Sequence, residues 1–221
     1  MRPSPGAPLS SSLFDRLAAI RVVPVVVIDD PGHAGPLADA LVSGGLPCAE
    51  VTFRTPAAEA AIRALATRTD ILVGAGTVVT ADHVDRAVAA GARFLVSPGF
   101  GVDVVRRAQE LGVPVLPGIA TASEAQAAVR SGLREVKFFP AEKSGGLGMV
   151  SALSAPFPEL RFMPSGGVSL ANVRDYLAHP AVFAVGGSWM VPREHIAAGD
   201  FDAIRRLAAE TIAHLDRTAG P

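Results

Sequence analysis

The chain has 221 residues, enough for one sizeable hydrophobic core in a single α/β domain. A net charge of −1 and an aromatic content of 5% argue against a polyanionic partner and a base-stacking surface, so we expect no nucleic-acid partner. A single cysteine, Cys48, excludes an internal disulfide and suits a cytoplasmic protein, and the apolar runs are too short to cross a membrane.

Strand-like and helix-like segments alternate along the chain after a tail. Residues 1–12 are rich in Pro, Ser and Gly and lack the apolar centre of a secretory signal, so we predict a flexible tail. A short leading helix is predicted over residues 13–20, with Ser12 as its cap. Strands are predicted over residues 22–28, 48–54, 71–75, 93–96, 113–116, 134–140, 161–163 and 182–185. Helices are predicted over residues 31–43, 57–67, 81–90, 102–111, 122–131, 147–153, 170–178 and 201–215.

This order predicts a single-domain (β/α)8 TIM barrel over residues 13–221, with a short N-terminal leading helix. An open doubly wound sheet is the alternative. A barrel places its chemistry at the carboxyl ends of its strands. Glycine, proline and small residues gather at the predicted strand ends, and such residues let a ligand approach the backbone closely.

Lys137 lies in the middle of the apolar, aromatic strand predicted over residues 134–140. The chain has 20 basic residues, and only two of them, Lys137 and Lys143, are lysines. An ammonium ion is costly to bury among apolar neighbours, so this environment favours the neutral, nucleophilic amine that forms Schiff bases. A strand-end lysine that reaches back to water is the alternative.

Side-chain alternation brings Lys137 together with two other charged residues. On the strand over residues 48–54, Glu50 and Arg54 share one face, and the apolar residues share the other. The polar faces should then point into the barrel. A lysine can form an iminium with a ketone, a carboxylate can move protons beside it, and an arginine can hold a substrate carboxylate. This trio indicates carbon–carbon bond chemistry next to a 2-oxo acid, and a structural ion-pair cluster is the alternative.

Two glycine-rich segments indicate a phosphate site. Ser165-Gly166-Gly167 follows the seventh predicted strand, and Gly186-Gly187-Ser188 follows the eighth. In TIM barrels the loops after these two strands often bind phosphate through backbone N–H groups. We therefore expect a phosphorylated 2-oxo acid as the small-molecule substrate.

With these motifs in order, the chain resembles the bacterial 2-keto-3-deoxy-6-phosphogluconate (KDPG) aldolase family, which also includes 4-hydroxy-2-oxoglutarate (KHG) aldolase. The resemblance runs from about Leu13 to the final helix. The matching segments are Val23-Pro24-Val25, Gly44-Gly45, Glu50-Val51-Thr52-Phe53-Arg54-Thr55, Gly74-Ala75-Gly76-Thr77-Val78, Ser97-Pro98-Gly99, Pro117-Gly118-Ile119, Lys137-Phe138-Phe139-Pro140-Ala141-Glu142, Ser165-Gly166-Gly167-Val168 and Gly186-Gly187-Ser188-Trp189.

The resemblance implies a class I aldolase that cleaves KDPG to pyruvate and glyceraldehyde 3-phosphate, with KHG as a second substrate. It implies that Lys137 forms the Schiff base and that Glu50 is the general acid/base. The substrate-binding residues that it implies are Arg54, Thr77, Pro98, Phe139, Ser165, Gly166, Gly167, Gly187 and Ser188. It further implies a cytoplasmic homotrimer that uses no cofactor and no metal.

Other functions remain as alternatives. The Glu-Val-Thr-x-Arg-Thr motif favours KDPG over its galactonate analogue. A metal-dependent phosphosugar epimerase or lyase is disfavoured because none of the five histidines makes a metal-ligand spacing with another. A barrel that binds a metabolite without turnover has no need of Lys137 and Glu50 together. We expect Cys48 to be core packing and Lys143 to lie in a solvated loop.

Overall fold

The structure, a computed structural model, describes residues 9–217, with the backbone alone for residues 9–12. Strands and helices alternate through these residues as the sequence predicts. The strands are β1 (Val22–Val26), β2 (Cys48–Thr52), β3 (Leu72–Gly76), β4 (Leu95–Val96), β5 (Val115–Leu116), β6 (Gly118–Ile119), β7 (Glu135–Phe138), β8 (Arg161–Pro164) and β9 (Val185–Gly187). The helices are α1 (Leu9–Ile20), η1 (Pro31–His33), α2 (Ala34–Ser43), α3 (Ala58–Ala66), α4 (Ala81–Ala89), α5 (Val102–Glu110), α6 (Ala122–Arg130), η2 (Glu142–Ser144), α7 (Gly146–Ser154), α8 (Val173–Ala178), α9 (Arg193–Ala198) and α10 (Phe201–Asp216).

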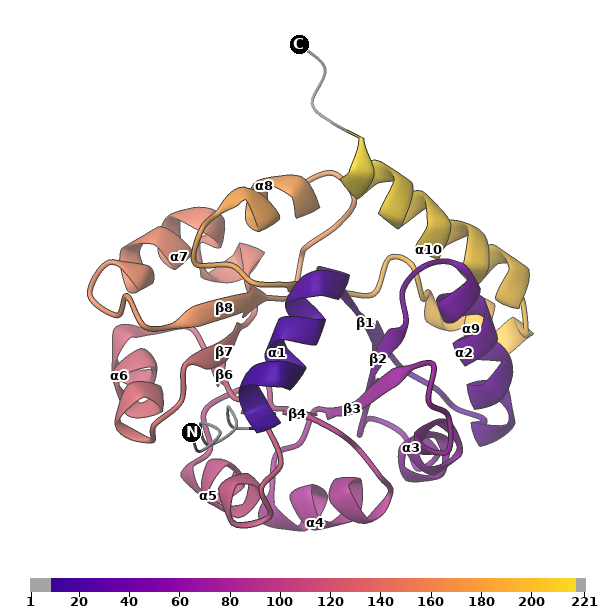
Figure 1. The fold of residues 1–221 in the computed structure, drawn as a ribbon, viewed down its shortest axis with the longest axis horizontal. Coiled ribbons are helices and arrows are strands. Elements are labelled where there is room, and N and C mark those ends of the chain that lie inside the picture. Colours follow the sequence, from indigo (N-terminus) through magenta and orange to yellow (C-terminus); the bar gives the residue numbers. More distant parts are fainter. Residues whose placement is uncertain (1–8, 218–221) are drawn as a thin grey trace, which may run out of the picture.

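The strands pair in parallel in two sheets. The larger sheet has the order β5-β4-β3-β2-β1-β9, and the smaller has the order β6-β7-β8. The register between β2 and β3 places Glu50 beside Gly74 and Thr52 beside Gly76. Figure 1 shows the helices placed around the outside of these strands. The fold is therefore an α/β fold with helices covering the outer face of parallel sheets.

Apolar side chains form one core on each side of the strands. The outer core lies between strands and helices and includes Val51 and Phe138. The inner core lies on the opposite face of the strands and includes Cys48 and Leu72. Since Cys48 and Val51 are separated by an odd number of positions on β2, these opposite placements confirm the predicted alternation.

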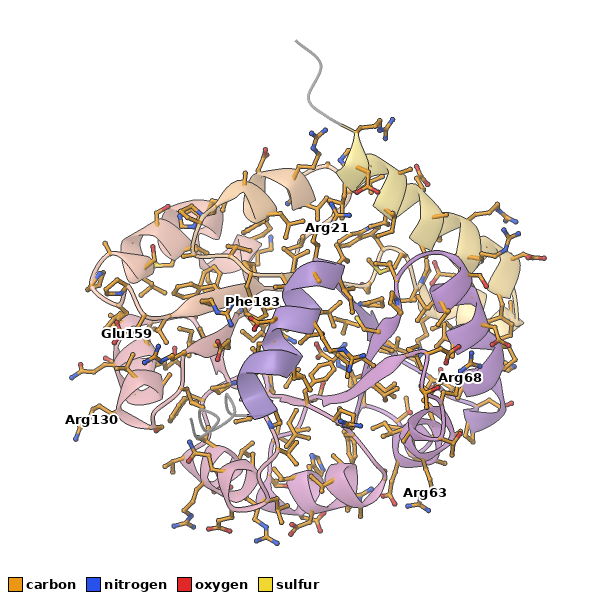
Figure 2. All side chains as sticks on the ribbon, viewed as in Figure 1. Arg21, Arg63, Arg68, Arg130, Glu159 and Phe183 are labelled. Carbon is orange, nitrogen blue, oxygen red and sulfur yellow. The ribbon has the colours of Figure 1, made fainter. Side chains whose placement is uncertain are left out.

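Helix α1 covers the inner core at the end where the strands begin (Figure 1). Its residues Leu13, Phe14 and Leu17 are buried there. The ring of Phe14 meets the ring of Phe183 edge to face, with their centroids 6.1 Å apart, and Figure 2 shows Phe183 beside this helix. The amino-terminal end of the strands is thus filled with apolar side chains, which leaves the carboxyl ends for chemistry.

The structure departs from the predicted elements at several boundaries. Helix α1 begins at Leu9, so Ser12 is not its cap, and the part of the predicted tail that covers residues 9–12 is helical. Residues 1–8 lie outside the described part of the chain. The strand predicted over residues 113–116 is followed by a second short strand because Pro117, which has no N–H, separates β5 from β6. Helix α9 was not predicted.

Between residues 9 and 217, no helix has both the length and the apolar character that a bilayer crossing requires.

Candidate active site

Glu50 and Lys137 meet at the carboxyl ends of β2 and β7. The Lys137 Nζ donates a hydrogen bond to the Glu50 Oε1 over 3.2 Å, although the residues are 87 positions apart in the sequence. The side chain of Glu50 is fully buried and that of Lys137 is 5% exposed. Because nitrogen and oxygen are in direct contact, a proton can pass between them. The predicted meeting of the two groups is confirmed.

The second carboxylate oxygen of Glu50 has no protein partner. Within the described residues, Oε2 of Glu50 is the one buried side-chain oxygen or nitrogen that lacks a hydrogen-bond partner. A buried unpaired acceptor is costly, and such atoms in native folds usually serve a function. This oxygen is available to a substrate or a water molecule that occupies the site.

Gly76, on the neighbouring strand β3, makes room for the Glu50 carboxylate. A Cβ atom at position 76 would lie 2.3 Å from the Glu50 Oε1, which is closer than a Cβ atom approaches other atoms in real structures. Glycine is therefore required where the backbone of β3 passes the carboxylate.

We expect the Gly76→Ala variant to lower kcat by about 100-fold, because a displacement of a catalytic group by about 1 Å has a cost of this size. Steady-state kinetics and thermal denaturation would measure activity and folding. Gly35→Ala is the matched control, since a Cβ atom there would meet nothing within 4 Å. Full activity of Gly76→Ala would contradict the placement of Glu50.

Arg54 and Thr77 lie together at the rim next to this pair. The Arg54 Nε donates a hydrogen bond to the Thr77 Oγ1 over 3.3 Å, and Arg54 is exposed. Strand β2 ends at Thr52, so the predicted extension of this strand to Arg54 was wrong, and Arg54 lies in a turn after the strand. Thr77 has a φ of 57°, a left-handed conformation that is uncommon for threonine. Residues in such strained conformations cluster at functional sites.

Thr52, two residues after Glu50, uses its side chain to bond to the neighbouring strand. Its hydroxyl donates to the Val26 carbonyl over 2.8 Å, and the residue is fully buried. It therefore ties β2 to β1 beneath the site.

Phe139 lies beside the Lys137 amine. The Lys137 Nζ is 5.3 Å from the centre of the Phe139 ring, a distance at which a cation and a ring attract each other. Pro98 lies where β4 ends, and its carbonyl oxygen would be 2.2 Å from a Cβ atom on Gly118. The loop that carries Pro98 thus packs tightly against the strand next to β7.

The two glycine-rich segments lie side by side, as predicted. Ser165 pairs with Gly186 in an isolated parallel bridge. Gly166 and Gly167 have φ values of 90° and 89°, which favour glycine. A Cβ atom on Gly166 would lie 3.1 Å from the Phe139 ring, so this loop also contacts the wall of the Lys137 site.

Ser188 ends the second of these segments at a cavity. The cavity has a volume of about 410 Å³ and is lined by Val25, Val27, Ser188, Trp189, Val191, Pro192, Arg193 and Glu194. Ser188 itself is exposed, and Gly187 before it is buried. Ser188 therefore faces open space directly after β9, the strand in which Gly186 pairs with Ser165.

Cys48 and Lys143 lie apart from this chemistry. Burial, followed by the negative charge of Glu50, raises the pKa of the Cys48 thiol far above its ordinary range, so Cys48 remains an uncharged thiol. It lies within the inner core, which confirms its predicted packing role. Lys143 is exposed on η2. Among residues 9–217, no three His, Cys, Asp or Glu side chains gather as a metal ion would require.

The sequence motifs contained further residues to which we assigned no role. Glu142 accepts a hydrogen bond from the Tyr176 hydroxyl, and its backbone N–H donates to the Gly166 carbonyl over 3.0 Å. It thereby ties the loop after β7 to the loop after β8. Its place at the end of the 137–142 motif was the available signal. Trp189, the single tryptophan, contacts Thr211 on α10, and no local pattern predicts that contact.

A buried amine that contacts a buried carboxylate, on parallel strands inside an α/β fold, suits the Schiff-base chemistry of a class I aldolase. The family model "KDPG and KHG aldolase" matches residues 13–207. The chain therefore belongs to the KDPG and KHG aldolase family.

Individual relatives agree with this assignment. The 2-dehydro-3-deoxy-phosphogluconate aldolase of Treponema pallidum is 50% identical over 202 residues, covering 91% of this chain and 96% of that protein. The KDPG aldolase of Legionella pneumophila was solved with pyruvate captured as a covalent carbinolamine intermediate. It has a TM-score of 0.86 and 41% identity, and the match covers 90% of this chain and 97% of that protein. The Zymomonas mobilis KDPG aldolase, solved with 3-phosphoglycerate, has a TM-score of 0.85 and 41% identity, and the match covers 94% of this chain and 97% of that protein.

Proposed function

We propose that this chain reversibly cleaves KDPG to pyruvate and glyceraldehyde 3-phosphate through a Schiff base on Lys137. The observation that carries the proposal is the 3.2 Å contact between the buried Lys137 Nζ and the buried Glu50 Oε1. The names of the relatives at 41–50% identity support the choice of substrate.

The reaction begins at the 2-keto group of the substrate. The neutral Lys137 amine adds to this carbon, and Glu50 delivers a proton to the oxygen, which gives a carbinolamine. Loss of water leaves an iminium. Glu50 then removes the proton of the C4 hydroxyl, the C3–C4 bond breaks, and its electron pair forms the enamine. Glyceraldehyde 3-phosphate leaves, a proton returns to C3, and water releases pyruvate and the free amine.

Other residues hold the substrate around the reacting carbons. The Arg54 guanidinium, next to Thr77, holds the carboxylate of the pyruvate part, since arginine matches a carboxylate with two parallel donors. Pro98 and Phe139 form the walls. The phosphate is held by the loops after β8 and β9, through Ser165, Gly166, Gly167, Gly187 and Ser188. The 3-phosphoglycerate of the Zymomonas mobilis structure supports a phosphate subsite in this family.

A second substrate is KHG, which would give pyruvate and glyoxylate. The description of the matching family model favours it. The same Lys137 and Glu50 chemistry applies, because only the part of the substrate beyond C4 differs.

We also propose that the strands close into a complete (β/α)8 barrel that forms one domain over residues 13–221. The pairing of β1 with β9, the bridges Phe162–Val182 and Ser165–Gly186 between the two sheets, and the continuity of β5 with β6 support closure. The resemblance to the family further supports a cytoplasmic homotrimer that needs neither metal nor cofactor. Sedimentation of the purified chain would count the subunits.

Borohydride reduction in the presence of pyruvate tests the proposed chemistry. We expect one covalent pyruvate adduct per chain by intact mass, located on Lys137 by peptide mapping, because borohydride reduces the iminium to a stable amine. Turnover of KDPG that continues in the presence of a chelator would exclude a metal-dependent enzyme and a non-catalytic binding protein. Absence of an adduct, or an adduct at another residue, would overturn the proposal.

A further inference from the structure

We propose that Thr211 on α10 is a positioning residue that acts through Trp189 to set the affinity of the phosphate subsite, without acting on the bond-breaking site. The inference rests on the proposed function, because it concerns the subsite assigned to the substrate phosphate. Thr211 lies 24 positions beyond Gly187, on a helix outside the strands.

The Thr211 hydroxyl has a fixed orientation. Its single proton is donated to the Leu207 carbonyl over 2.8 Å, within α10. A hydroxyl has one donor and two acceptor lone pairs, so a lone pair remains for another group. The Trp189 Nε1–H donates to this oxygen over 3.0 Å. Thr211 is fully buried, so water does not compete for the bond.

The Trp189 indole in turn lies against the backbone of the phosphate loop. A Cβ atom on Gly187 would be 1.8 Å from the Trp189 Cζ3 and 2.3 Å from its Cε3, so the six-membered ring covers Gly187 directly. The ring is thus held at its N–H by Thr211 and contacts Gly187 with its opposite edge. A rotation of the indole would either displace Gly187 or break the hydrogen bond between Trp189 and Thr211.

The loop that this ring supports faces open space. Ser188, between Gly187 and Trp189, is exposed at the cavity of about 410 Å³, and Trp189 lines the same cavity. Glu50 and Lys137 form a hydrogen bond with one another, and among the described residues neither forms a hydrogen bond with Trp189 or Thr211. A change at Thr211 should therefore alter binding of the phosphorylated end of a ligand and leave the chemistry at Lys137 unchanged.

Trp189 also provides the means of measurement, because it is the single tryptophan of the chain. Titration of the full chain with inorganic phosphate, followed by Trp189 fluorescence, measures the subsite without turnover. We expect Thr211→Val, which keeps the branched shape and removes the acceptor, to weaken phosphate binding and raise the KM for KDPG by about tenfold. The kcat for KDPG, the KM for KHG and the yield of the pyruvate adduct should change by less than about twofold.

Two further variants separate positioning from general damage to the fold. Thr211→Ser keeps the hydroxyl and should behave as the wild type. Trp189→Phe keeps a ring over Gly187 and removes the N–H donor, so it should show the same selective rise in the KM for KDPG. Equal losses on KDPG and KHG in Thr211→Val, or unchanged phosphate affinity, would overturn the inference. Failure of wild-type KDPG cleavage would instead refute the proposed function, and the phosphate titration would still decide the role of Thr211.

Discussion

Replacing Lys137 with alanine is expected to lower kcat/KM for KDPG by about 10⁴-fold or more, the scale of loss when a covalent nucleophile is removed. The reason is that no other lysine lies within a predicted or observed strand. Lys143 is the only other lysine of the chain, and it is exposed on η2. A coupled assay for released pyruvate measures the loss, and the borohydride adduct should disappear with it.

The control for this variant is Lys143→Ala. It removes the same side chain from a solvated position, so it should retain both turnover and the adduct. Thermal denaturation checks that Lys137→Ala remains folded; we expect a lower Tm, because the buried Glu50 carboxylate loses its partner. An adduct that persists in Lys137→Ala, or one that disappears in Lys143→Ala, would refute the assignment of the Schiff-base residue.

Replacing Glu50 with glutamine should separate adduct formation from turnover. The glutamine keeps the size of the side chain but cannot accept and return a proton. We expect kcat for KDPG to fall by about 10²–10⁴-fold, the usual contribution of a general acid/base. The borohydride adduct should still form on Lys137, more slowly. Stopped-flow measurement of pyruvate release together with the trapping yield gives both quantities.

Glu159→Gln is the matched control for this substitution. Glu159 is exposed at the periphery of the molecule in Figure 2, in the segment that precedes β8. Its replacement should leave kcat unchanged. If Glu50→Gln were as active as the wild type, another group would have to move the protons, and the unpartnered oxygen of Glu50 would need a different explanation.

Strand alternation explains why Glu50 and Lys137 could be placed together from the sequence. Both lie within strands, β2 and β7, where the side-chain direction follows directly from position. The same argument failed for Arg54, because β2 ends at Thr52 and a turn has no comparable periodicity. The alternation of side chains predicts the direction of a side chain only where the backbone hydrogen bonds between strands continue.

The glycine loops could be placed together because parallel strands carry their loops to one end of the sheet. In contrast, the hydrogen bond between Trp189 and Thr211 joins a loop to a helix 22 positions later and depends on the rotation of α10 about its axis.

The start of α1 at Leu9 was missed because serine caps helices well and is also tolerated inside their first turn. Local residue preferences therefore predicted the elements more reliably than their ends.

Helix α1 fills the amino-terminal end of the strands with Leu13, Phe14 and Leu17. The contact between Lys137 and Glu50 lies toward the other end, so the two ends of the strands differ in character. A solid support or a fusion partner attached ahead of this helix would hold the molecule by its apolar-filled end. The opening through which reactants enter and products leave would then face the solution, which suits the chain to use as an immobilised catalyst for carbon–carbon bond formation.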